Sequence, residues 1–175
     1  VLTYHILSQI IFMDKKENFP QMAEITLRQM KLSDLDSFNN INLDCWTEMY
    51  TTSFYTTYLI KDSDLCVVAE CGSYLAGYML GKVEGTGTDW HSHISAVSVS
   101  PEFRRLGVGK MLIDYFEAVS ENTHDCYFAD LYVRVSNTVA IDMYKRRGYE
   151  IFRTVRGYYS GEEDGYDMRK PLSRD

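Results

Sequence analysis

The hydrophobic and polar positions of this chain begin to alternate regularly at residue 25. Ile25 to Met30 alternates apolar and polar residues, which is the period of a half-buried strand. Helical spacing follows from Ser33 to Leu43, and Ser33 is a suitable N-cap for that helix. A second helical pattern covers Phe54 to Leu59, after a stretch from Asp44 to Ser53 that has no clear period. The first third of the chain therefore predicts a strand, a helix, a loop and a second helix.

The rest of the chain alternates between strand and helix patterns. One helix is expected to start near Gly107, and another runs from Asn137 to Arg147 before Gly148 ends it. The remaining expected strands are Leu65–Cys71, Leu75–Val83, His93–Val99, Cys126–Val133, Tyr149–Arg156 and Gly165–Arg169. Hairpins early in the chain and strand–helix–strand crossovers later predict an α/β fold with one mixed sheet.

Length and charge limit the classes of protein that fit this pattern. The chain has 175 residues, of which 45% are hydrophobic and 14% aromatic, so it can bury a sizeable core as one domain. Its net charge is −7. Because nucleic acids and anionic membranes are bound by clustered Lys and Arg, this charge argues against direct binding of either partner.

The four cysteines are scattered without a C-x-x-C pair, so they predict neither a zinc site nor a disulfide framework. We expect reduced thiols that pack as small apolar groups, and a cytoplasmic protein. The opening residues 1–12 are apolar, but they have no basic leader and are too short to span a bilayer. We interpret residues 1–24 as an N-terminal extension that is not part of the core fold.

The loop between the expected strand ending at Val99 and the next helix has the composition of an anion site. Arg104 and Arg105 precede Gly107 and Gly109, where a helix start presents backbone N–H groups. The nucleoside-triphosphate loop does not fit, because Gly-Lys is followed by Met, and the three-glycine dinucleotide motif is incomplete. A glycine-rich loop with two solvated arginines is the structural alternative.

This loop, Arg-Arg-Leu-Gly-Val-Gly, resembles the acetyl-coenzyme A pyrophosphate loop of the GCN5-related N-acetyltransferase superfamily. The segment Asn137 to Tyr149 resembles the second signature of that superfamily, Asn-x-x-Ala-x-x-x-Tyr-x-x-x-Gly-Phe/Tyr. The resemblance implies the GCN5-related N-acetyltransferase fold, with a mixed central sheet of about seven strands flanked by about four helices. It also implies acetyl-CoA as cosubstrate and an N-acetyltransferase domain over residues 25–175.

Further segments are similar to one branch, the catalytic subunits of N-terminal acetyltransferases. Asn39 to Asp44 and Thr47 to Tyr50 favour the NatB type within it. This implies co-translational acetylation of N-termini beginning Met-Asp, Met-Glu, Met-Asn or Met-Gln. It further implies a heterodimer with a large helical-repeat auxiliary subunit and ribosome association through that subunit. The segment from Leu35 to Leu59 would supply much of the interface, and its structural alternative is burial in the domain's own core. The chain departs from the branch at Cys45-Trp46 and Thr51, in the expected substrate loop.

The reaction needs a deprotonated amine, a donor for the developing oxyanion and a proton for the leaving thiolate. The resemblance assigns the general acid to Tyr144, whose structural alternative is an aromatic on the packed face of a helix. His93 is the candidate for hydrogen bonding to substrate or relaying a proton, although a histidine bonded to nearby backbone is a close alternative. His91 and His93 lack a convincing set of further ligands, so we expect no metal.

The same resemblance supplies the other site residues. Those expected to bind the cofactor are Val97, Val99, Arg104, Arg105, Leu106, Gly107, Val108, Gly109, Lys110 and Asn137. Those expected to bind the peptide are Glu48, Tyr50, His93, Ser95, Ala96, Asn137, Tyr144, Tyr158 and Tyr159. Because neighbouring residues of a strand point to opposite faces, only one of the two adjacent tyrosines is expected to face the groove.

Two other functions stay open from the sequence. The acceptor could be a NatA-type peptide or another amine, or the chain could be an acetyl-CoA-binding interaction module without turnover. The residues do not decide which group acts as general base, since an α-amino group titrates at about 7.7 to 8.0 and needs little assistance.

Overall fold

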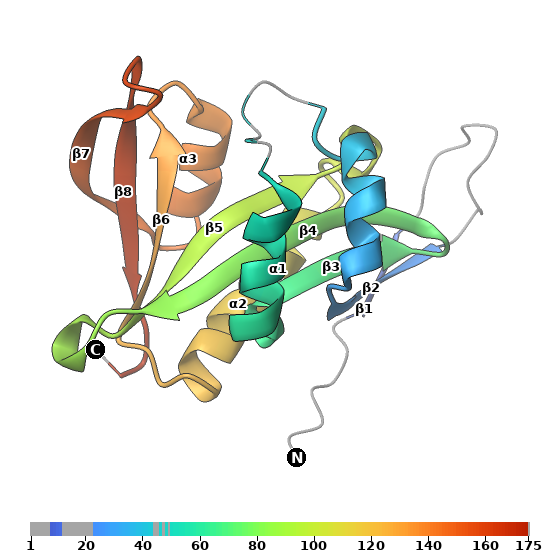
Figure 1. Cartoon of the computed structure of the whole chain (residues 1–175), viewed down its shortest axis with the longest axis horizontal. Coiled ribbons are helices and arrows are strands. Elements are labelled where there is room, and N and C mark those ends of the chain that lie inside the picture. Colours follow the sequence, from blue (N-terminus) through green and yellow to red (C-terminus); the bar gives the residue numbers. More distant parts are fainter. Residues whose placement is uncertain (1–7, 12–22, 44–45, 47, 49, 175) are drawn as a thin grey trace. The chain divides into compact units, whose positions relative to one another are not determined.

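In a computed structural model of the chain, the described residues are 8–11, 23–43, 46, 48 and 50–174. Within them the elements follow the predicted alternation (Figure 1). The strands are β1 (Ser8–Ile11), β2 (Ala23–Gln29), β3 (Cys66–Cys71), β4 (Tyr74–Glu84), β5 (His91–Val99), β6 (Phe128–Arg134), β7 (Glu150–Tyr159) and β8 (Glu163–Pro171). The α-helices are α1 (Thr52–Lys61), α2 (Val108–Asn122) and α3 (Thr138–Lys145). The 3-10 helices are η1 (Leu32–Asn40), η2 (Ser63–Leu65), η3 (Gly87–Asp89) and η4 (Pro101–Phe103).

Seven of these eight strands are the predicted ones, with ends that differ by a few residues. The eighth, β1, lies before residue 25 and pairs antiparallel with β2. The domain boundary at residue 25 stays a prediction. None of the described helices is both long and apolar enough to cross a membrane.

The first predicted helix is a 3-10 helix and does not start at Ser33. Its N-cap is Lys31, whose backbone N–H donates to Asp34 Oδ2 at 2.7 Å. The carboxylate of Asp34 also accepts two hydrogen bonds from Arg28, at 2.7 and 2.9 Å. The Ser33 N-cap prediction is wrong because this aspartate, one residue further on, satisfies the free N–H group at the helix start.

Contacts divide the chain into two compact units. The first comprises Val1–Leu80 and Ala96–Phe116. Within it the strands follow the order β1, β2, β3, β4 and β5. Its core is built around stacked rings of Phe38 and Tyr78, with centroids 4.0 Å apart, and the Tyr78 hydroxyl donates to Asn42 Oδ1. Burial of an aromatic ring with its hydroxyl satisfied stabilises the packing of η1 on β4.

The second unit comprises Gly81–Ser95 and Glu117–Asp175. Its strands follow the order β4, β5, β6, β8 and β7, and β4 and β5 contribute different residues to the two units. β5 and β6 run parallel, so His93 is the register partner of Asp130. β8 lies antiparallel between β6 and β7, which is visible as three neighbouring strands in Figure 1. Strands β5, β6, β8 and β7 therefore lie side by side in this order.

Candidate functional site

The predicted cofactor loop lies in the first unit and contains two left-handed residues. Arg105 has φ +66° and Gly107 has φ +84°. The conformation costs glycine little, whereas a side-chain-bearing residue adopts it only when the surrounding structure holds it there. Arg104 donates through Nε to the carbonyl oxygen of Val99 at 3.1 Å, which ties the loop back to the end of β5. α2 begins directly afterwards at Val108.

The donor set of this loop suits a doubly charged anion. The side chains of Arg104, Arg105 and Lys110 are exposed at the start of the 15-residue helix α2, where backbone N–H groups lack helical acceptors. Val108 is buried and anchors the first turn, while Leu106, Gly107 and Gly109 are half-buried. These residues fit the pyrophosphate of coenzyme A by charge and by backbone donors.

One face of β5 carries most of the predicted site residues of that strand. His93, Ser95, Val97 and Val99 are half-buried on this face, whereas Ile94 and Ser98 on the other face are buried. Val97 and Val99 therefore lie on a face of the strand that is partly open. Ala96 is half-buried and packs against the core of the first unit.

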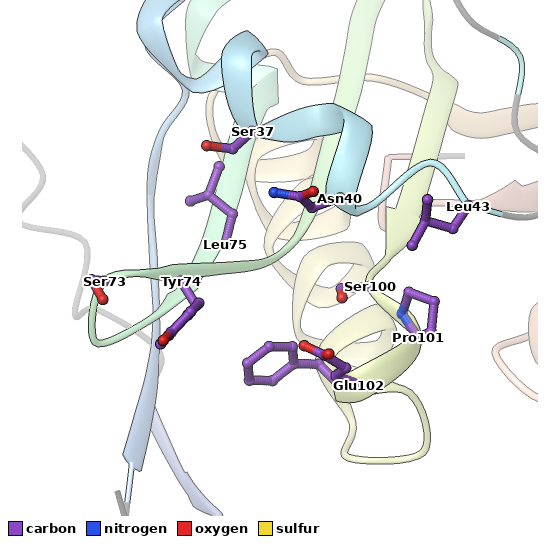
Figure 2. A pocket seen from close by; sticks show the side chains of 10 residues that line it. Ser37, Asn40, Leu43, Ser73, Tyr74, Leu75, Ser100, Pro101 and Glu102 are labelled. Carbon is purple, nitrogen blue, oxygen red and sulfur yellow. The ribbon is translucent and has the colours of Figure 1, made fainter. Parts of the chain in front are cut away.

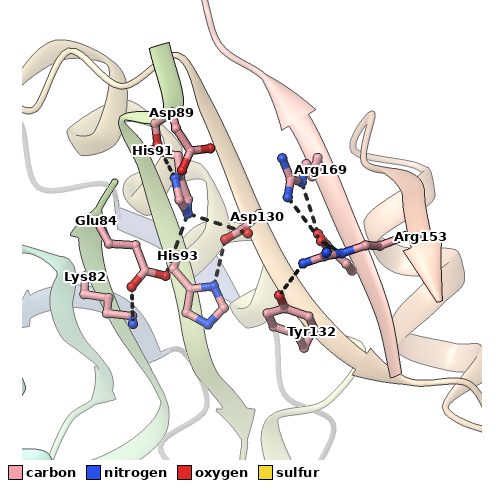
Figure 3. A network of polar contacts seen from close by, with 10 residues as sticks. Lys82, Glu84, Asp89, His91, His93, Asp130, Tyr132, Arg153 and Arg169 are labelled. Atoms are coloured by element: carbon pink, nitrogen blue, oxygen red, sulfur yellow. Dashed lines mark hydrogen bonds and ion pairs between the residues drawn. The ribbon is translucent and has the colours of Figure 1, made fainter. Parts of the chain in front are cut away.

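In the second unit His93 is bonded to a buried carboxylate (Figure 3). Its Nδ1 lies 2.7 Å from Asp130 Oδ1. Asp130 is 4% exposed and its Oδ2 lies 3.7 Å from Nε2 of His91. His91 in turn donates from Nδ1 to the backbone carbonyl of Asp89 at 2.6 Å. The structural alternative for His93, a bond to nearby backbone, thus describes His91 instead.

Figure 3 also shows a second group of polar contacts, at the arginines of the last hairpin. Asp167, fully buried on β8, accepts hydrogen bonds from Arg153 and Arg169. Arg153 also contacts the hydroxyl of Tyr132 at 3.4 Å. The ring of Tyr132 lies 5.7 Å from that of His93, so the histidine is enclosed by two residues of β6.

The two predicted tyrosines of the last hairpin both reach β6. Tyr158 stacks on Tyr132 with centroids 4.5 Å apart, and the guanidinium of Arg134 lies 4.1 Å from the centre of the Tyr159 ring. The rings of Tyr158 and Tyr159 are 4.9 Å apart and perpendicular. The expectation that they point to opposite faces is wrong, because the register of β7 shifts between Val155 and Tyr159.

Gly165 on β8 makes room for this pair of rings. A Cβ atom at this position would lie 3.2 Å from Cβ of Tyr158 and from Cε2 of Tyr159. Since that separation is shorter than ordinary van der Waals contact, the absence of a side chain on β8 allows both tyrosines to approach β6.

Tyr144 lies on α3, and Asn137 lies directly before it. Tyr144 is buried and packs edge-on against Tyr149, with centroids 5.6 Å apart. Burial raises the pKa of the Tyr144 hydroxyl well above its ordinary value of 10, so the group is a proton donor at neutral pH. Asn137 is the N-cap of α3, and its Oδ1 accepts a hydrogen bond from the N–H of Ala140. That Asn137 binds the cofactor and the peptide stays a prediction.

The predicted peptide residues of the first unit lie just before α1. Glu48 is exposed, and Tyr50 is half-buried and stacks on Phe54 with centroids 4.1 Å apart. Thr51 is the N-cap of α1, since its side chain accepts from the N–H of Phe54, which gives a local reason for this departure from the family pattern. Cys45 lies outside the described residues, and its neighbour Trp46 is exposed.

A pocket of about 380 Å³ lies in the first unit, near the start of the cofactor loop (Figure 2). Its walls come from η1, from the turn between β3 and β4, and from η4. The lining residues are Ser37, Asn40, Leu43, Ser73, Tyr74, Leu75, Ser100, Pro101, Glu102 and Phe103. None of them is a predicted catalytic, cofactor or peptide residue.

The thiols of Cys66, Cys71 and Cys126 are buried, and that of Cys66 donates to the backbone carbonyl of Asp62 at 3.3 Å. Burial raises the pKa of Cys71 and brings that of Cys126 to about 11, so these thiols are unreactive packing groups. Within the described part of the chain, no three or more His, Cys, Asp or Glu side chains are grouped to hold a metal ion.

The sequence reasoning missed Asp130 and Tyr132. One signal was available for the first of them. Aspartate is depleted in strands, yet Asp130 interrupts a run of strand-forming residues from Cys126 to Val133. A charged residue at such a position indicates a buried partner, but the partner itself is visible only in the parallel register of β5 and β6.

Comparison with known proteins extends this description. Residues 35–149 match the family model described as "Acetyltransferase (GNAT) family". The chain is 52% identical to the N-terminal acetyltransferase B complex catalytic subunit naa20 of Schizosaccharomyces pombe, over 85% of this chain and 86% of that protein. Among solved structures it is similar to Chaetomium thermophilum Naa20 in complex with a bisubstrate analogue, with 39% identity, a TM-score of 0.82, and coverage of 86% and 88%. It is also similar to a chain of the NatB acetyltransferase complex bound to CoA and MES, with 36% identity, a TM-score of 0.76, and coverage of 83% and 98%.

Proposed function

Because this chain belongs to the acetyltransferase (GNAT) family, as an N-terminal acetyltransferase of the NatB catalytic-subunit type, we propose that it acetylates the α-amino group of nascent chains. The acceptors are N-termini that begin Met-Asp, Met-Glu, Met-Asn or Met-Gln. The observation that carries this proposal is the similarity to a NatB catalytic subunit, which runs across 85% of the chain.

The donor is acetyl-CoA, which when bound supplies an activated acetyl thioester. Arg104, Arg105 and Lys110 hold its pyrophosphate together with the backbone N–H groups at the start of α2, as their exposure and the loop conformation support. Backbone N–H groups near Val97 and Val99 on the half-open face of β5 polarise the thioester carbonyl.

The acceptor peptide is held by Glu48 and Tyr50 and by the pair Tyr158 and Tyr159. His93, whose ring is fixed by Asp130, contacts the peptide end. Tyr144, whose hydroxyl stays protonated at neutral pH, donates a proton to the departing thiolate, the role that the family signature gives it.

The partner is a helical-repeat auxiliary subunit, through which the heterodimer associates with ribosomes in the cytoplasm. Support comes from the similar chain of the NatB acetyltransferase complex and from apolar side chains on η1, α1 and the segment between them. Leu32, Leu43 and Ile60 are 54%, 65% and 81% exposed. A partner that covers these side chains would remove their apolar surface from water.

Peptide selectivity tests this function. The full chain with its auxiliary subunit is incubated with acetyl-CoA and peptides that differ only in the first two residues. We expect kcat/KM for Met-Asp to exceed that for Ser or Ala N-termini at least about 100-fold, since a site built for a polar side chain rejects analogues that lack it. Preference for Ser or Ala would identify a NatA-type enzyme, and no turnover with any peptide would identify a binding module.

The Gly165→Ala variant tests the role of the tyrosine pair. Its new methyl group would lie 3.2 Å from a ring carbon of Tyr159 and 3.3 Å from a ring carbon of Tyr158, so both rings have to move by a few tenths of an ångström. We expect the peptide KM to rise several-fold with the KM for acetyl-CoA unchanged, and the free energy of unfolding to fall by about 1 kcal/mol. Steady-state kinetics and thermal unfolding measure these effects.

Gly72→Ala is the matched control. Gly72 has a left-handed backbone, with φ +61°, which Gly165 does not share, and a Cβ atom there meets nothing within 4 Å. It is expected to lose about 1 kcal/mol of stability through backbone strain alone and to keep the peptide KM. Equal peptide KM values for the two variants would mean that the tyrosine pair does not bind the peptide.

A further inference from the structure

We propose that Asp130 is a positioning residue that makes Nε2 of His93 the acceptor of the proton lost by the substrate's α-ammonium group. The inference rests on the proposed function, in which His93 contacts the peptide end. It concerns the identity of the base and the residue that prepares it, neither of which the sequence resolved.

The contact between the two side chains follows from the backbone. His93 and Asp130 are register partners on the parallel strands β5 and β6, so their Cα atoms face each other across the ladder. The side chains are 12% and 5% exposed, and the bond between Nδ1 and Oδ1 measures 2.7 Å. Short, buried side chains on paired strands have few other rotamers available, unlike the long chains of a surface ion pair.

Hydrogen-bond chemistry then assigns the proton. A carboxylate only accepts hydrogen bonds, so the nitrogen bonded to Asp130 carries the hydrogen. A neutral imidazole has one N–H group, which leaves the lone pair on Nε2. Asp130 therefore selects the tautomer in which the outer nitrogen can accept a proton. When Nε2 takes the ammonium proton, the N–H bond of the substrate breaks, the free amine keeps the electron pair, and the imidazolium faces the carboxylate.

The surroundings hold both partners in this arrangement. The ring of Tyr132 lies 5.7 Å from His93 and comes from the same face of β6 as Asp130, two residues along. Asp130 Oδ2 lies 3.7 Å from Nε2 of His91, and Glu84 Oε1 lies 3.7 Å from the same nitrogen while Lys82 pairs with Glu84. Asp130 is thus held through Oδ1 by Nδ1 of His93, while Oδ2 lies 3.7 Å from His91 (Figure 3).

The pKa of the substrate's own α-amino group limits how much a base can raise the rate. An α-amino group with a pKa of about 8 is roughly 10% deprotonated at pH 7, so a base that removes its proton raises the rate by about 10-fold at most under these conditions. Asp130→Asn is expected to lower kcat/KM for a Met-Asp peptide about 10-fold at pH 7. The loss should shrink toward none at pH 9, where the amine is already free.

A double-mutant cycle separates positioning from simple stability. With the full chain and its auxiliary subunit, kcat/KM is measured from pH 6.5 to 9 for wild type, Asp130→Asn, His93→Ala and the double variant. We expect Asp130→Asn to cost nothing further once His93 is alanine. An equal loss in both backgrounds, or a loss independent of pH, would overturn the proposal.

Asp167→Asn is the matched control, because Asp167 is equally buried but pairs with Arg153 and Arg169. Any decrease in kcat/KM that Asp167→Asn causes should be the same in the wild-type and His93→Ala backgrounds. The tautomer is also readable without turnover from ring ¹⁵N shifts of the histidine-labelled chain, which has four histidines. A wild-type His93 that carries its hydrogen on Nε2 would refute the inference even if the Asn variant did not fold. An inactive wild type with the Nδ1–H tautomer would instead refute the proposed function.

Discussion

Replacing Tyr144 by phenylalanine is expected to lower kcat at least about 100-fold, because a positioned general acid contributes that much or more. The KM for acetyl-CoA should stay within a few-fold of wild type, since the ring itself is retained. Initial rates with a Met-Asp peptide measure both values. Burial raises the pKa of this hydroxyl above its ordinary value of 10, so the acid form persists as the pH rises. The wild-type kcat should therefore not decline between pH 8 and 10 through ionisation of Tyr144.

Tyr149→Phe is the matched control for this variant. Tyr149 is also buried, its ring touches that of Tyr144, and its hydroxyl pKa is likewise raised by burial. The second signature accepts Phe or Tyr at this position, so we expect kcat within about 3-fold of wild type. If both variants retained full turnover, the acid would have to be another group.

Replacing Arg28 by alanine is expected to lower the free energy of unfolding by about 3 kcal/mol at pH 7, because it leaves the buried carboxylate of Asp34 without its positively charged partner. Arg28 forms two hydrogen bonds to Asp34, which is 8% exposed, and a third to Glu70 at 2.6 Å. Chemical unfolding measures the change. As a control, Lys110→Ala removes an exposed pair with Asp114 and should cost no more than about 0.5 kcal/mol.

The pH dependence of this effect has a definite sign. Burial raises the pKa of Asp34, but hydrogen bonds from Arg28 and from the N–H of Lys31 outweigh it and hold the pKa below its usual range. The carboxylate therefore contributes stability above the unfolded pKa of about 3.9, and this contribution is lost as the pH falls through the folded value. Without Arg28 the buried group favours its protonated form, so the deficit of the variant should shrink from pH 7 to pH 4. A deficit that is constant with pH would contradict this assignment.

Local pattern was sufficient for most of the elements. Strong helical periodicity in α2 and strand periodicity in β3 to β5 arise from side chains close together in the chain, and those segments form where predicted. The cap of η1 was harder to predict, because Asp34 is held by Arg28 on β2, which is itself bonded to Glu70 on β3. Such an ion pair is decided by tertiary neighbours rather than by the local N-cap preference of Ser33.

The last hairpin shows a second limit of prediction from the local sequence pattern. Strict alternation of faces is a property of regular strands, and the register shift in β7 breaks it at Tyr158 and Tyr159. Whether both rings reach β6 then depends on Gly165, a residue of β8 that the pattern of β7 does not include.

By itself the sequence determined the family, the order of the elements and the loop with Arg104, Arg105 and Gly107, since all of these depend on residue type and spacing along the chain. Only the tertiary structure decided which group prepares His93. Asp130 is 37 residues away in the chain and meets the histidine only because β5 and β6 pair in parallel in one particular register. Register is selected by burial over the whole strand, so a single strand's pattern does not reveal the partner of one side chain.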